Sequence, residues 1–140
     1  MSLDPGDVSL VLQIIVFFML ILGVPLAKGG SPKNFIRHGY LTLVALAIHT
    51  VMVLVFMVYM VTEGLVTLTS LPSTTIALVV SHIIVGLVSI ALGYVIVVGW
   101  LSQPIENFNC MKAKKLMTPT LILWAIALVI GFIIHVFGFF

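Results

Sequence analysis

Residues 75–101 read TIALVVSHIIVGLVSIALGYVIVVGWL and contain no charged residue. At about 1.5 Å of rise per residue, this run is long enough as one α-helix to cross a hydrocarbon core about 30 Å thick. A strand of a membrane β-barrel would be about half as long and would alternate polar and apolar side chains, which this run does not do. The stretch therefore predicts a transmembrane helix.

Three further apolar runs of similar length are separated from it by short breaks rich in proline, glycine and polar residues. The complete set predicts helices at about residues 8–27, 39–61, 75–101 and 119–140. We expect Pro119 at an early helix position, which tolerates proline. The chain, residues 1–140, is thus predicted to be a single all-α domain, an integral membrane bundle of four helices running up and down.

The composition supports lipid as the solvent of this fold. The chain is 62% hydrophobic and 7% charged, whereas soluble domains are about 45–50% apolar and about 25% charged. A net charge of +2 is too small to indicate nucleic-acid binding, and the single cysteine, Cys110, excludes an internal disulfide. We therefore expect a multi-pass protein of the cell membrane with the lipid bilayer as its surroundings.

The basic residues predict the orientation of the bundle. All of them fall in the first and third breaks: Lys28, Lys33, Arg37, Lys112, Lys114 and Lys115. Because basic loops stay on the cytoplasmic side, these breaks are expected inside and both termini outside.

Four histidines are the residues most expensive to place in such a bundle, and an ionisable group inside a bilayer is by default a functional candidate. His38 stands beside Arg37 at the membrane rim, where an interfacial position explains it. From the helix rise, His49, His82 and His135 are expected about 15, 20 and 24 Å from the basic side. The three deeper histidines therefore cluster between the middle of the bilayer and its outer half.

Glycines accompany two of these histidines at one helical turn. Gly86 follows His82 by four residues, and Gly131 precedes His135 by four. Such glycines leave room for a flat macrocycle against the helix backbone, although small residues also simply let membrane helices pack closely.

Three interpretations of the histidines remain open. The first is one haem b with His82 and His135 as axial ligands, or with His49 as the alternative partner if the second and fourth helices face each other across the bundle. The second is a copper site that combines imidazole with thioether ligands from Met52, Met57 or Met60. The third is structural: the histidines hydrogen-bond neighbouring helices in a membrane-complex subunit that holds no cofactor.

The chain also resembles known families. RHGY at residues 37–40 with His49, and SHIIVG at residues 81–86, resemble small b-type transmembrane cytochromes, whose antiparallel helices hold haem b through histidines. Over about residues 33–140 the chain is similar to a family of four-helix prokaryotic membrane proteins implicated in the maturation of haem-copper oxidases. The similarity lies in the basic residue and histidine that open the second helix, the His-Ile-Ile of the third, and the Thr-Pro before the fourth.

These resemblances imply electron transfer, or the handling of haem, within a larger membrane complex. A second membrane subunit or a quinone is the expected partner. Because His38 has no second histidine beside it on the inner side, one haem is expected rather than two. No residue is predicted to be catalytic, and an electron-transfer or accessory subunit is expected rather than a stand-alone enzyme.

Overall fold

The computed structural model describes residues 5–28, 31–58, 62, 72–102 and 114–137. These residues are almost entirely helical and contain no strand. The elements are α1 (Pro5–Lys28), α2 (Pro32–Met52), the π-helical η1 (Val53–Met57) that continues α2, α4 (Ser73–Leu101) and α5 (Lys114–Val136). The prediction of an all-α fold is confirmed.

Four of the described helical segments are long and apolar enough to cross a membrane, with mean hydropathies between 2.3 and 2.7. Large apolar side chains cover their outer surface, including Leu22, Leu54 and Val95, each more than half exposed. In water such a surface would be unstable, whereas in lipid it needs no protein cover. The prediction of a multi-pass membrane protein is confirmed to this extent.

The second helix begins at Pro32 rather than near Gly39, so this predicted boundary was wrong. Ser31 has an extended backbone, with φ −84° and ψ 137°, and Pro32 occupies the first turn. The amide nitrogens of Asn34 and Phe35 lie 3.0 and 3.1 Å from the Ser31 carbonyl oxygen, to which they donate. Proline suits this place because the first helical amides have no partner within the helix. The basic residues after Pro32 are therefore helical.

The position expected for Pro119 is also corrected. Because α5 begins at Lys114, Pro119 lies inside the helix instead of at its start. A proline inside a helix lacks the amide that would bond the carbonyl four residues earlier, here that of Lys115. This position is only one turn from the start of α5, where few helical bonds are affected. The predicted ends at residues 59–61 and 138–140 lie outside the described residues.

A π-helical turn interrupts the second span at η1. The amide of Val58 donates to the carbonyl of Val53, five residues earlier. Neither proline nor glycine occurs in Val53–Met57, so no residue there forces the change of pitch. Single π-turns inside α-helices are found frequently at functional sites.

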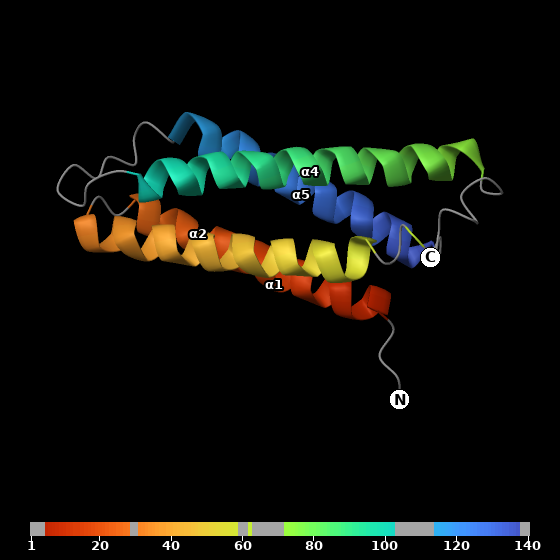
Figure 1. Cartoon of the computed structure of the whole chain (residues 1–140), viewed down its shortest axis with the longest axis horizontal. Coiled ribbons are helices and arrows are strands. Elements are labelled where there is room, and N and C mark those ends of the chain that lie inside the picture. Colours follow the sequence, from red (N-terminus) through yellow and green to blue (C-terminus); the bar gives the residue numbers. More distant parts are fainter. Residues whose placement is uncertain (1–4, 29–30, 59–61, 63–71, 103–113, 138–140) are drawn as a thin grey trace.

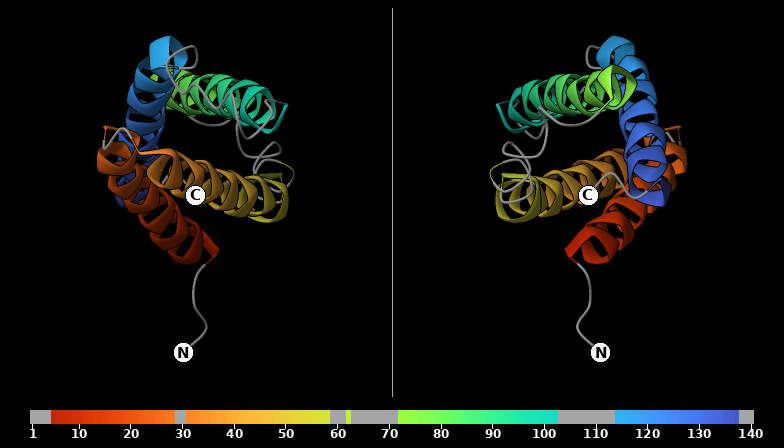
Figure 2. Two further views of the ribbon diagram at one scale, coloured as in Figure 1. Left: turned by 90° about the vertical axis from the view of Figure 1, so that its left-hand side faces the viewer. Right: turned by 90° about the vertical axis from the view of Figure 1, so that its right-hand side faces the viewer.

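The helices alternate in direction, and the closest pairs are α1 with α2 and α4 with α5. Figure 1 shows that the described chain begins and ends at one end of the bundle, which we call the terminal end. The opposite end holds Lys28 and Arg37, and we call it the basic end. Seen from either end, the α4–α5 pair lies on one side and the α1–α2 pair on the other (Figure 2).

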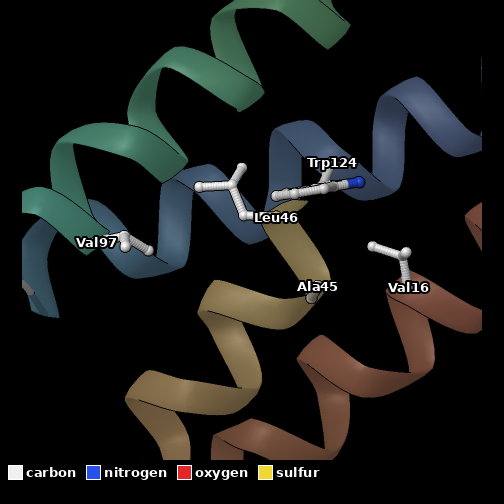
Figure 3. Close-up of a cluster of buried hydrophobic side chains, with 5 residues drawn as sticks. All are labelled: Val16, Ala45, Leu46, Val97 and Trp124. Atoms are coloured by element: carbon white, nitrogen blue, oxygen red, sulfur yellow. The ribbon is translucent and has the colours of Figure 1, made fainter. Parts of the chain in front are cut away.

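All four helices contribute to one buried apolar cluster, which we call the core cluster (Figure 3): Val16, Ala45, Leu46, Val97 and Trp124. Each of these side chains is at most 4% exposed. Because lipid is as apolar as the cluster, close packing rather than exclusion of water holds the helices together here.

Candidate ligand cavity and its histidines

A cavity of about 270 Å³ lies between α2 with η1 on one side and α4 with α5 on the other. Its walls are mainly apolar, and the polar exceptions come from several helices. The lining residues that matter for its chemistry are Gln13, His49, Met52, Met57, His82, Gly86 and Trp124. The candidate site is therefore an apolar chamber with two imidazoles in its walls.

The His82 imidazole is held in place by α5. Its Nδ1 lies 2.9 Å from the carbonyl oxygen of Ala127. A carbonyl oxygen only accepts hydrogen bonds, so Nδ1 carries the proton and the neutral ring keeps its lone pair on Nε2. This is the tautomer in which Nε2 can bind a metal.

His49 is deeply buried, at 7% exposure, and its ring packs against Trp124 with 4.6 Å between the ring centroids. Among the described residues, neither His49 Nδ1 nor Trp124 Nε1 has a hydrogen-bond partner. A buried polar nitrogen without a partner costs free energy and calls for an explanation, such as a bound ligand or water. Both residues line the cavity.

His135 lies elsewhere, at the terminal end, with its Nε2 3.1 Å from Oδ1 of Asp7. Along α5 the order is Trp124 beside His49, then Ala127 and Gly131 beside His82, then His135 itself. The structure thus brings His49 and His82 to one cavity and does not bring His135 to it. The pairing of His82 with His135 stays a prediction.

His38 lies against α1 and away from the cavity lining. A Cβ added to Gly23 would stand 2.9 Å from His38 Nδ1, so the imidazole packs directly over that glycine. This position is near the basic end, within the first turns of α2; its location at the membrane rim stays a prediction.

The two glycines predicted to make room for a macrocycle differ in their surroundings. No heavy atom lies within 4 Å of a Cβ built on Gly86, which lines the cavity. A Cβ built on Gly131 would stand 2.9 Å from Cε1 of His82. Gly86 therefore faces open space, whereas the space over Gly131 is filled by the His82 imidazole.

The soft ligands expected for copper are partly present. Met52 and Met57 line the cavity together with His49 and His82; Met60 lies outside the described residues. Within the described part of the chain, no group of three or more His, Cys, Asp or Glu side chains is placed to hold a metal ion.

Sequence reasoning missed three polar residues of α1. Gln13 lines the cavity and donates from Nε2 to Ser9 Oγ at 3.4 Å. Asp7 lies in the first turn of α1 and pairs with His135. Ser9 and Gln13 stand four residues apart in an otherwise apolar run, and this spacing places them on one helix face.

Comparison with protein families, with curated proteins and with solved structures finds no match to this chain. The interpretation of the cavity therefore depends on its geometry and chemistry.

Proposed function

We propose that this chain is a haem b-binding membrane protein that transfers electrons, or handles haem, within a larger membrane complex. The observation that carries the proposal is that His49 and His82, from different helices, line one apolar cavity inside the bundle. A haem brings its own equatorial ligands and needs only axial ones from the protein, which histidines on facing helices supply. A bare metal ion would need more ligands than two imidazoles.

The residues present fit this group. The Ala127 carbonyl fixes the tautomer of His82, as the second hydrogen bond of a ligating imidazole usually does. His49 is buried and lines the same cavity as His82. Gly86 also lines the cavity and leaves open space there. When bound, haem b supplies a one-electron redox centre. We therefore favour His49 and His82 as axial ligands, because His135 would have to leave Asp7 to take part.

The size and opening of the cavity also bear on the fit. Its volume of about 270 Å³ is below the range of about 300–1,000 Å³ that is usual for small-molecule sites, so the cavity encloses only part of a haem. Two of its lining residues, Val58 and Leu87, are more than half exposed. A haem held by His49 and His82 would therefore extend beyond the cavity, past these exposed apolar residues.

The orientation and the partners belong to the same proposal. The basic end faces the cytoplasm, because Lys28, Lys33 and Arg37 gather there and basic segments resist translocation. The terminal end, and the cavity nearer to it, then face the outer half of the cell membrane. Since the described surface is apolar, the partner is another membrane subunit or a quinone.

Cofactor analysis of the purified protein tests the proposal. We expect one haem b per chain, with iron in equal amount, in the wild type and in the His38→Ala and His135→Ala variants. The His49→Ala and His82→Ala variants should lose most of the haem while keeping their helical content. Haem retained in both of those variants would contradict the assignment.

Copper is the second candidate because Met52 and Met57 line the cavity with both imidazoles. Thioether and imidazole ligands together suit Cu(I). The same analysis distinguishes the candidates, since it would then find copper and no iron. Absence of both metals from protein purified from its native membrane would favour the structural role.

A further inference from the structure

Among the described residues of α1, the buried polar side chains lie in the half of the helix near the terminal end. Ser9 and Gln13 on α1 are 3% and 7% exposed. Asp7 and His135 form their ion pair beside them at the bundle surface, where the two side chains are 57% and 34% exposed. We call these four residues the polar strip.

The polar strip meets the cavity beside Gly131, where the Gln13 amide approaches the His82 imidazole. Oε1 of Gln13 and Cε1 of His82 lie 3.6 and 2.9 Å from the same point, the place where a Cβ on Gly131 would stand. Gln13 itself lines the cavity. Because Gly131 has no side chain, nothing from α5 separates Gln13 from His82.

Beyond Gln13 the buried face of α1 becomes apolar. The next buried residue on the same face of α1 is Val16, which is fully buried. Val16 belongs to the core cluster, to which Trp124 and Leu46 also belong (Figure 3). The core cluster therefore lies between the polar strip and the basic end.

Polar groups buried in an apolar medium cost free energy unless they are hydrogen-bonded, and the cost is highest inside a bilayer. The hydrogen bond from Gln13 Nε2 to Ser9 Oγ is long, at 3.4 Å. It uses the NH₂ group of the Gln13 amide, so the amide oxygen can accept a hydrogen bond from another group. Water that reaches Gln13 from the surface would satisfy both residues.

We propose that the polar strip is a water-access route from the terminal surface to the cavity, and that the core cluster closes it toward the basic end. The route supplies water, and hence protons, to the cavity from one side of the membrane only. Its role depends on the proposed function, because it serves the cavity in which haem would bind. The titratable groups along it, among the described residues, are Asp7, His135, His82 and His49.

Cysteine labelling tests the route whether or not haem is bound. In a Cys110→Ser background without other cysteines, Ser9→Cys and Gln13→Cys are each exposed to a charged, membrane-impermeant methanethiosulfonate. The reagent reacts with the thiolate, which forms only where water reaches the sulfur. Two matched controls on α1 are Val16→Cys, in the core cluster, and Ile15→Cys, whose side chain is 47% exposed toward lipid.

In reconstituted vesicles we expect Ser9→Cys and Gln13→Cys to be labelled from the terminal side and unlabelled from the basic side. Val16→Cys and Ile15→Cys should be unlabelled from both sides. Ser9→Cys exchanges one atom of the side chain, so it tests the route even if Gln13→Cys does not fold. Lack of labelling at Ser9→Cys, or equal labelling at Val16→Cys, would overturn the route. The haem content of the same samples reports separately on the proposed function.

Discussion

The Nδ1 of His82 in α4 lies 2.9 Å from the main-chain oxygen of Ala127 in α5 and donates its proton to it. The acceptor is a carbonyl that normally accepts a hydrogen bond from a backbone amide of its own helix. The contact therefore links a side chain of one helix to the backbone of the next. Gly131, one turn further along α5, supplies the space for the ring. The orientation of His82 is thus determined by the packing of α4 against α5.

Replacing Gly131 by alanine should displace His82. The new Cβ would stand 2.9 Å from Cε1 of the imidazole, closer than real Cβ contacts allow, and overpacking of this kind costs about 1–3 kcal/mol. We expect a lower midpoint of thermal unfolding in detergent and loss of bound haem. The control is Gly99→Ala in α4, where no heavy atom lies within 4 Å and stability should be unchanged or slightly higher. Equal behaviour of the two variants would show that His82 does not need this space.

The ion pair between Asp7 and His135 should contribute little to stability. Both side chains are partly exposed, and exposed pairs are worth about 0–1 kcal/mol and are weakened by salt. Asp7→Asn keeps the shape and removes the charge. We expect a small fall in the unfolding midpoint at low salt and none at high salt; a large fall that persists at high salt would mean that the pair is buried in the membrane-embedded protein.

The orientation of the bundle can be tested on Cys110, which lies outside the described residues. The positive-inside rule places it with the third break in the cytoplasm. An impermeant thiol reagent should label it in inverted vesicles and leave it unlabelled in intact cells. The reverse labelling pattern would show that the bundle has the opposite orientation, and the polar strip would then open to the cytoplasmic side.

The two methionines in the cavity distinguish copper from haem. Met52→Leu with Met57→Leu keeps the volume and the apolar character and removes both thioethers. If haem is the ligand, the double variant should bind it as the wild type does. Bound Cu(I) that is lost in the double variant would instead establish the copper site.

The membrane spans were readable from the sequence because each is a long apolar run bounded by polar breaks. The boundaries were less accurate, since Pro32 and Lys114 start helices inside segments that read as breaks. A break predicts only that the chain leaves the apolar region, and a helix can continue through charged residues beyond it. The turn at η1 has no signal in proline or glycine and could not be predicted.

The candidate site was predictable only in part. His49, His82 and Gly86 were singled out and line the cavity. The role of Gly131 was not foreseen, because its neighbour His82 belongs to another helix and no spacing within one run reveals it. Gln13 was missed because a neutral amide within a membrane span is a weaker sign of a functional site than an ionisable histidine.

The visible spectrum of the purified protein before and after dithionite tests the central claim most directly. If His49 and His82 are the ligands, the wild type and His135→Ala should show low-spin haem b with sharp bands on reduction. In His49→Ala and His82→Ala the loss of one ligand should abolish that low-spin spectrum. A wild type without haem bands, or a low-spin spectrum that survives loss of His49 and disappears with His135, would contradict the assignment of His49 and His82 as the ligands.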